Sequence, residues 1–166
     1  MASMTVEEFS ERMNIAIRTG AIGNAMVAAA NRIAVRMDAI AQKRVTGGGS
    51  STRRLNVRSG KLRQSIKWNV KRIKGGVRAS IQAGGSAGGA VVKYARIHET
   101  GLPDPVLPKN GKYLRFKGRK GWVTVKSVSI PARPYLKPGR DAGARIARQV
   151  MTEEFRKSLR TVGIGT

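Results

Sequence analysis

Apolar residues recur at helical spacing through the first 45 residues. Thr5 and Glu8 have the spacing of a capping box, in which each side chain binds the other's backbone N–H group and begins a helix. Further along, an apolar residue recurs at every third or fourth position, interrupted only around Gly20 and Gly23. Glycine costs about 1 kcal/mol in a helix interior. The pattern therefore predicts a helical segment over residues 5–45, either one helix kinked near Gly20 or two helices in succession.

Small residues dominate part of this segment. Five of the ten residues from Ala25 to Ala34 are alanine. Small side chains would allow another helix or another subunit to approach closely, whereas alanine also favours helix formation by itself. Both interpretations stay open at this point.

The period changes to two between residues 66 and 83. Ile66, Trp68 and Val70 alternate with polar residues, and a second alternating run follows the Gly75–Gly76 pair. Two such runs around a glycine turn predict a β-hairpin with one buried and one polar face. Residues 113–116 and 122–130 predict a second hairpin, in which the apolar phase shifts after Val125, as at a bulge or a sheet edge.

A helical pattern returns near the C-terminus. The apolar residues of 138–160 share one helix face, and they are Ile146, Val150, Met151, Phe155 and Leu159. Together these patterns predict a single α+β domain over residues 1–166, in which a long N-terminal helix and a C-terminal helix pack on a mostly antiparallel sheet of two hairpins. The sheet region spans 61–137, and residues 161–166 form a tail.

Two glycine-rich stretches predict flexible loops. Residues 46–52 read TGGGSST and open a basic loop over 46–60, while residues 84–89 read GGSAGG. The second stretch lacks the Lys-Ser/Thr ending of a phosphate-binding loop and the spacing of a dinucleotide-binding fingerprint, so it does not indicate phosphate binding.

The charge is strongly positive and unevenly distributed. The chain has 33 Lys and Arg residues against 9 Asp and Glu residues, a net charge of +24. Between Gln42 and Arg140 there are 24 basic and 2 acidic residues. Such a field favours DNA or an acidic protein as a partner, although a basic loop can also be merely solvated. The candidate contact residues are Arg53, Arg54, Arg58, Lys61, Arg63, Lys117, Arg119 and Lys120.

Glu99 is an acidic residue in the basic middle of the chain, within the octapeptide 94–101 (YARIHETG). We expect it to be ionised and bonded either to backbone N–H groups or to an arginine, with Arg133 and Arg63 as the leading candidates. Gly101 follows, where a chain reversal with positive φ would require glycine.

The residues for common catalytic and metal sites are missing from the sequence. There is no cysteine, His98 is the only histidine, and the nine carboxylates are scattered. His98 and Glu99 could form an acid–base pair, but adjacent residues on a helix or strand point apart. We therefore expect no catalytic residue, no metal site and no cofactor. No apolar run approaches the roughly 20 residues that span a bilayer, and no signal peptide is recognisable, so we expect synthesis in a cytoplasm.

Three segments carry a resemblance to a known family: 57–66 (VRSGKLRQSI), 94–101 and 130–138 (IPARPYLKP). In this order and spacing they resemble the tail-completion or neck proteins of long-tailed bacteriophages, over about residues 5–160. Ser59 stands where Thr is usual, Tyr135 replaces Phe, and Pro138-Gly139 replaces Pro-Ala. The positions that match the motifs are Gly60, Leu62, Tyr94, Ala95, His98, Glu99, Gly101, Pro131, Arg133, Pro134, Tyr135 and Leu136.

The resemblance implies a structural virion protein without enzymatic activity. It implies a homo-oligomeric ring, with a hexamer favoured over a dodecamer, that joins the tail to the head around the DNA channel. Its neighbours would be the head connector or stopper protein and the tail terminator or tail tube protein. The rival from another class is a free basic nucleic-acid-binding protein of ribosomal or chromatin type, although no RNA- or DNA-reading motif is recognised. A toxin or hydrolase is a distant third.

Overall fold

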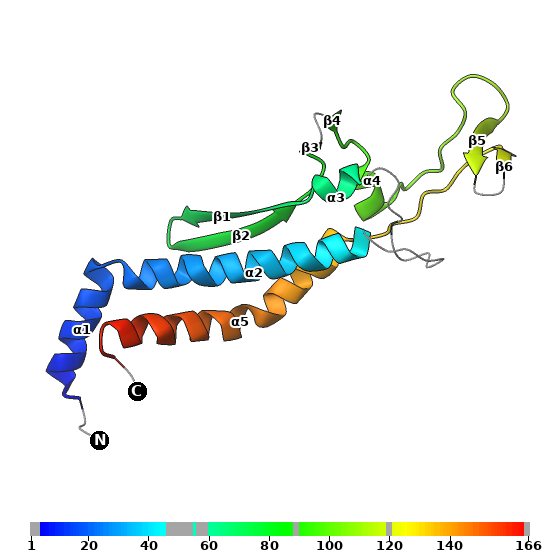
Figure 1. Ribbon diagram of the computed structural model, residues 1–166. Helices are drawn as coiled ribbons and strands as arrows, with labels where there is room; N and C mark the ends of the chain where they lie inside the picture. Colours follow the sequence, from blue (N-terminus) through cyan, green and yellow to red (C-terminus); the bar gives the residue numbers. More distant parts are fainter. Residues whose placement is uncertain (1–3, 46–54, 56–59, 88–89, 119–120, 165–166) are drawn as a thin grey trace.

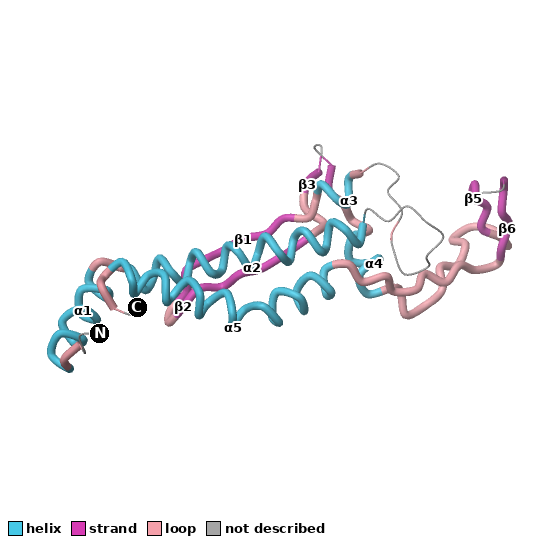
Figure 2. The backbone as a smooth tube through the Cα atoms, turned by 60° about the horizontal axis from the view of Figure 1, so that its bottom comes forward, coloured by secondary structure: helices cyan, strands magenta, loops and turns pink. Residues whose placement is uncertain are grey.

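The computed structural model describes residues 4–45, 55, 60–87, 90–118 and 121–164 of the chain (Figure 1). The fold is α+β, as predicted. Two long helices, α2 (Ala21–Val45) and α5 (Leu136–Thr161), lie side by side along an elongated body. Helix α1 (Val6–Arg18) lies at one end of this body, and a β-hairpin projects at the other end (Figures 1 and 2).

The helical N-terminal segment divides into two helices at the predicted place. The capping box is present: the Thr5 backbone N–H donates to Glu8 Oε2 at 3.0 Å, and the Glu8 N–H donates to Thr5 Oγ1 at 3.2 Å. Helix α1 then ends before Gly20, whose φ of +71° is left-handed and turns the chain into α2. A hydrogen bond from the Arg12 side chain to the Gly163 carbonyl joins α1 to the end of α5.

Within the described residues, the strands form three separate hairpins. Strands β1 (Lys67–Ile73) and β2 (Gly76–Gln82) pair from Lys67 opposite Gln82 to Ile73 opposite Gly76, as the period-two pattern predicts. The others are β3 (Ser86–Ala87) with β4 (Ala90–Val91), and β5 (Leu114–Gly118) with β6 (Gly121–Val125).

The prediction of one sheet made from two hairpins is wrong for the part of the chain that is described. Each sheet has two strands, and only β1–β2 lies against the long helices. Alternation in a sequence shows which face of a strand is apolar, but it does not show which element covers that face. The expected second strand of the later hairpin, 122–130, is also shorter: β6 ends at Val125, where the apolar phase shifts, and only Val128 pairs beyond it, with Val106.

Two loop predictions need correction as well. Residues 84–89 were expected to be a plain flexible loop, yet Ser86–Ala87 pairs with Ala90–Val91 in a short antiparallel ladder. The basic segment after Gly60 contains the short helix α3 (Lys61–Gln64), and the octapeptide contains α4 (Ala95–Thr100). Helices of four and six residues are too short to produce a periodic apolar stripe, and tertiary contacts stabilise them. The expected flexible loop at 46–52 lies outside the described residues.

Small residues bring α2 and α5 together. A Cβ atom on Gly139 would lie 2.5 Å from the carbonyl oxygen of Met37, and one on Gly143 would lie 2.5 Å from Met37 Cγ. Of the alanines of α2 that the sequence singled out, Ala25, Ala29, Ala30 and Ala34 are buried, and Ala30 lines a hollow with Val77 of β2 and Ala147 of α5. Close approach of helices within the chain accounts for these buried alanines. Helix α5 begins at Leu136, two residues before the predicted 138.

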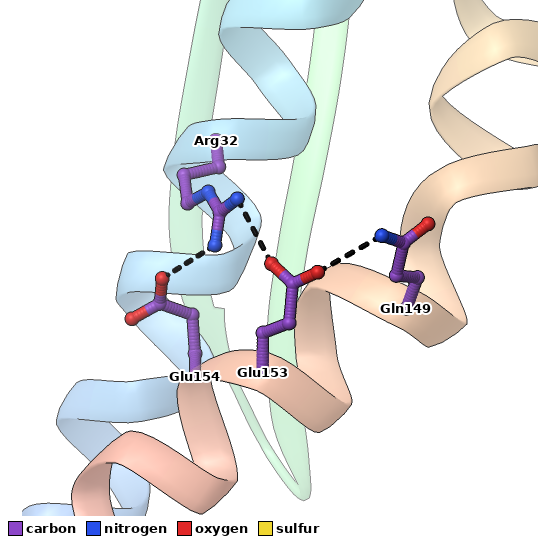
Figure 3. Close-up of polar contacts among 4 residues, drawn as sticks. All are labelled: Arg32, Gln149, Glu153 and Glu154. Atoms are coloured by element: carbon purple, nitrogen blue, oxygen red, sulfur yellow. Dashed lines mark hydrogen bonds and ion pairs between the residues drawn. The ribbon is translucent and has the colours of Figure 1, made fainter.

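A polar cluster on the surface links the same two helices (Figure 3). Arg32 on α2 binds Glu154 Oε1 at 2.7 Å and Glu153 Oε2 at 3.0 Å, and Gln149 donates to Glu153 at 2.9 Å. The hydrogen bonds to Glu154 and Glu153 raise the pKa of Arg32. The hydrogen bonds from Gln149 and Arg32 lower the pKa of Glu153. Among the described helices, none is long and apolar enough to cross a membrane.

Candidate functional site

The carboxylate of Glu99 lies at the N-terminal end of α5. Glu99 Oε2 accepts the backbone N–H groups of Tyr135 and Leu136 at 2.8 and 2.9 Å, and Oε1 accepts that of Lys137 at 2.9 Å. A helix begins with four N–H groups that lack intrahelical partners. The next position here is Pro138, which has no N–H group. One side chain therefore satisfies the whole start of α5, and the helix dipole stabilises its negative charge.

The prediction that Glu99 binds backbone N–H groups is confirmed, and the two candidate arginines are wrong. No ion pair joins Glu99 to Arg133 or Arg63 in the described chain. Arg63 Nε donates instead to Gln42 Oε1 at 3.5 Å. Arg133 donates its backbone N–H to the His98 carbonyl at 2.8 Å. Three aligned N–H dipoles supply the positive potential that a guanidinium was expected to supply.

Tyr135 brings the three sequence motifs into one core. Its side chain is 1% exposed, and its hydroxyl donates to the Ala95 carbonyl at 3.2 Å. Burial raises the pKa of Tyr135, and the negative charge of Glu99 adds to the effect, so the hydroxyl remains a neutral donor. The core cluster contains residues from all three motifs, and its members are Ala41, Val45, Leu55, Leu62, Ile66, Val92, Ala95 and Tyr135.

The glycine of the octapeptide lies directly against the third motif. Gly101 has a φ of +72°, as predicted for a chain reversal. A Cβ atom there would lie 2.7 Å from the backbone nitrogen of Ala132 and 3.1 Å from the carbonyl oxygen of Ile130. These neighbours are backbone atoms that cannot rotate away. Glycine is therefore required both by conformation and by space.

Ser65 joins the first motif to the β3–β4 region, a role that sequence reasoning missed. The residue is 2% exposed; its hydroxyl donates to the Leu62 carbonyl at 2.7 Å and accepts the Gly84 N–H at 3.3 Å. The signal in the sequence for this role was the position of Ser65 directly before the apolar residue Ile66. Gly60, with a φ of +71°, begins α3 in the same motif.

His98 is a packing residue in this junction. Its ring meets Tyr94 edge-on, with centroids 5.5 Å apart and planes at 78°. Burial, and then the charge of Arg133, lower the pKa of His98. Arg133 Nε is itself buried with no hydrogen-bond partner in the described chain. Within the same residues, no three His, Cys, Asp or Glu side chains are grouped to hold a metal ion.

The junction defined by Glu99, Gly101 and Tyr135 holds the base of an arm, residues 102–134 (Figure 1). Leu102 N–H donates to the Ile130 carbonyl at 3.0 Å, and Val106 and Val128 exchange two backbone hydrogen bonds of 2.8 and 3.0 Å. The β5–β6 hairpin follows this stem. In the segment that leads back to α5, Pro131 is exposed and Pro134 is half-buried. Pro134 and Leu136, the first residue of α5, line a hollow together with Glu99.

The register of β5–β6 separates two different faces. Leu114 lies opposite Val125 and Phe116 opposite Val123, which gives an apolar face. Arg115 opposite Thr124 and Lys117 opposite Trp122 give a basic and aromatic face, on which the Arg115 guanidinium lies 4.9 Å from the Trp122 ring centroid. Trp122 is 65% exposed and Phe116 is 42% exposed. Both faces are thus accessible, which is unusual for apolar side chains in one cluster.

The predicted basic contacts do not form one patch in the described chain. Lys61 and Arg63 are exposed on α3, and Lys117 is exposed on the arm hairpin at the far end of its stem (Figure 1). The remaining predicted residues, Arg53, Arg54, Arg58, Arg119 and Lys120, lie outside the described residues. A basic face that sequence reasoning did not single out covers β1–β2, where Lys67 and Lys71 are exposed and Lys71 lies opposite Arg78. Its signal was the polar half of the alternating pattern.

Comparisons with known proteins add no relative: no family model, no curated protein and no solved structure was found to match the chain.

Proposed function

We propose that this chain is a structural subunit of the head–tail junction of a long-tailed bacteriophage, a neck or tail-completion protein that forms a ring. One observation carries the proposal. The three segments behind the family resemblance, 57–66, 94–101 and 130–138, contribute Leu62, Ala95 and Tyr135 to one core cluster. The three motifs pack against one another in a single junction. Three motifs that build one junction support the family resemblance more strongly than three unrelated short matches would.

The surface of the subunit supports assembly as its role. The arm exposes aromatic side chains on both faces, with Phe116 42% exposed on one face and Trp122 65% exposed on the other. A subunit that buries this area against neighbours accounts for the exposure, and a heterologous contact repeated by rotation closes a ring.

The charge fits a ring around DNA. A lumen with a net positive subunit charge of +24 would attract the phosphate backbone without reading bases. In this proposal the ring, a hexamer in preference to a dodecamer, lies between the head connector or stopper and the tail terminator or tail tube in the virion. Exposed Lys61, Arg63 and Lys117 are the described members of the basic set proposed to contact DNA or an acidic neighbour.

Labelling of particles tests the proposal. An antibody against the chain, applied to virions of the phage that encodes it, is expected to bind at the junction between head and tail in electron micrographs. The Lys61→Glu/Arg63→Glu variant is expected to reduce the fraction of tailed particles while leaving the melting temperature of the purified chain unchanged, because exposed charges contribute little to folding. Label elsewhere, or its absence from particles, would overturn the assignment.

A free nucleic-acid-binding protein is the second candidate. The observation that favours it is the exposed cationic face of β1–β2, formed by Lys67, Lys71 and Arg78. For such a protein the logarithm of duplex affinity would fall steeply and linearly with the logarithm of salt, and the chain would purify with cellular nucleic acid. Copurification with RNA or chromatin, together with no label on particles, would favour this candidate over the neck protein.

A further inference from the structure

The exposed charges differ between α1 and the arm, which lie at the two ends of the elongated subunit. Helix α1 lies at one end, and the arm with β5–β6 lies at the other (Figures 1 and 2). Each end also exposes apolar side chains: Val6 is 79% exposed on α1, and Trp122 is 65% exposed on the arm. The arm cannot reach the α1 of its own chain across the length of the body, so any contact between the two ends joins different copies.

Acidic residues are concentrated on α1. Three of the nine acidic residues of the chain, Glu7, Glu8 and Glu11, lie within five positions. Glu8 is held in the capping box, whereas Glu7 and Glu11 are exposed and have no ion pair within the described residues. Because they are four residues apart, they share one helix face. That face also carries Val6 and Ile15 and, at its C-terminal end, Arg18, which leaves Glu7 and Glu11 as the charges of its first two turns.

The basic face of the arm has the opposite character. Arg115 and Lys117 project from the same side of β5, and Trp122 and Thr124 project beside them from β6. No acidic residue occurs from Lys112 to Lys126. The cation–π contact between Arg115 and Trp122 holds a charge and an apolar ring together in one surface.

The spacing of the two charge pairs also agrees. Residues four apart in a helix are separated by a rise of about 6 Å, and residues two apart in a strand by about 7 Å. Glu7 and Glu11 can therefore face Arg115 and Lys117 at the same time, while Trp122 covers Val6 or Ile15. We propose that the basic face of the arm of one copy docks on α1 of the next copy, and that this contact links the subunits head to tail.

The charges favour this arrangement over a symmetric dimer. Two arms placed face to face would oppose Arg115 and Lys117 with the same residues, and two α1 helices would oppose glutamates, which costs free energy. An arm-to-α1 contact uses two different surfaces, so each copy still offers one free surface of each kind and the chain of contacts continues until it closes. The inference rests on the proposed ring, and it names the contact that would build it.

Charge exchange on the purified full chain tests the contact. The α1 exchange variant is Glu7→Lys/Glu11→Lys, and the arm exchange variant is Arg115→Glu/Lys117→Glu. The control variant is Lys67→Glu/Lys71→Glu. It makes the same change of charge as the arm exchange variant, but on the exposed face of the β1–β2 hairpin. Self-association is measured by sedimentation at low salt, where charge contacts are strongest, and circular dichroism measures melting. If the arm exchange variant unfolds early, Lys117→Glu and Glu11→Lys provide the same comparison with one charge each.

The expected result has three parts. Each exchange variant alone weakens self-association by more than about a hundredfold, and the control does not. Combining both exchanges in one chain restores association. Mixing the two single-exchange variants in equal amounts also restores it, because each supplies the surface that the other now needs. If the chain that carries both exchanges associates no better than the single-exchange variants, the proposed contact is overturned.

Other results would also overturn it. The wild-type chain could remain a monomer at every concentration. The arm exchange could instead lower affinity for duplex DNA, measured by fluorescence anisotropy, without changing self-association, in which case nucleic acid occupies the arm. The particle-labelling experiment separates the two proposals. If the antibody labels the head–tail junction but the charge exchanges do not change self-association, only the arm-to-α1 contact is rejected. If the antibody does not label particles but the charge exchanges control ring formation, only the neck assignment is rejected.

Discussion

The β1–β2 and β5–β6 hairpins are built alike and are stabilised differently. Both are antiparallel ladders with one apolar face. The apolar face of β1–β2, which includes Val70 opposite Ala79, lies on α2, and Ala79 shares a hollow with residues of α2 and α5. The apolar face of β5–β6, which includes Val123 opposite Phe116, contacts no long helix of the described chain.

An isolated two-stranded hairpin is marginally stable in water. The β1–β2 hairpin gains its stability from apolar area buried within the subunit. The β5–β6 hairpin depends on its stem and on the Glu99 junction, so we expect its faces to be buried only by neighbouring molecules. Under the proposed ring, the same pattern of side chains encodes a folding element in one place and an assembly element in the other.

A matched pair of substitutions tests this difference with the largest expected effect. Val70→Asp places a charge against α2 and should lower the free energy of unfolding by about 3 kcal/mol. Val123→Asp makes the same change on the arm and should lower it by less than about 0.5 kcal/mol, while reducing self-association. Urea denaturation measures both. Equal losses from the two substitutions would show that the arm is part of the folding core.

Glu99→Gln tests the junction between the two regions. The amide can still accept hydrogen bonds, but it loses the charge and turns an NH₂ group toward the N–H groups of α5. We expect a loss of about 1–3 kcal/mol in the free energy of unfolding and faster hydrogen exchange at Leu136 and Lys137. Asp104→Asn, at an exposed position on the arm stem, is the control and should change neither. A Glu99→Gln chain as stable as wild type would contradict the capping role.

Acidification should weaken the same junction. The pKa of His98 is lowered, first by burial and then by Arg133, so the folded state favours the neutral ring. A group with a depressed folded pKa contributes stability above its ordinary value of about 6.5, and this stability is lost as pH falls toward the folded pKa. The difference in melting temperature between wild type and His98→Gln should therefore be constant above pH 6.5 and become smaller as the pH falls below 6.5. Parallel curves would rule out the histidine contribution.

The smallest effect is expected for the surface cluster between α2 and α5. Arg32→Gln removes contacts from a half-exposed guanidinium to Glu153, which is also half-exposed, and to Glu154, which is 13% exposed. Exposed ion pairs are screened and contribute little, so the melting temperature should change only slightly, and the change should disappear at high salt. A large, salt-independent loss would mean that polar contacts, and not Gly139 and Gly143 against Met37, hold the two helices together.

The sequence predicted the elements whose signals are local. The capping box at Thr5 marked the start of α1, Gly20 marked the break before α2, and alternation gave β1–β2. The short helices α3 and α4 were missed because they depend on tertiary contacts and have too few residues for a periodic stripe. The separation of the two hairpins was missed because the identity of a covering element is a long-range property.

The junction was predicted in part. Charge alone pointed to a partner for Glu99, and arginine was a reasonable candidate in so basic a chain. The start of a helix offers several N–H groups together, and it satisfied the carboxylate instead. Pro138 was a signal for a helix start in this region, since proline is tolerated in the first turn of a helix, where its missing N–H group needs no partner, but it did not show that α5 begins two residues earlier at Leu136. The glycine contacts with Met37 depend on distances between helices and have no local signal.

Hydrogen exchange measured residue by residue, on the free subunit and on the proposed assembly, distinguishes a hairpin covered within the subunit from one covered only by neighbours. We expect the amides of β1–β2 to be protected in both states, because their hairpin is covered within the subunit. The amides of β5–β6 should exchange quickly in the free subunit and become protected on assembly. Protection of β5–β6 equal to that of β1–β2 in the free subunit, or no change at β5–β6 on assembly, would contradict the account.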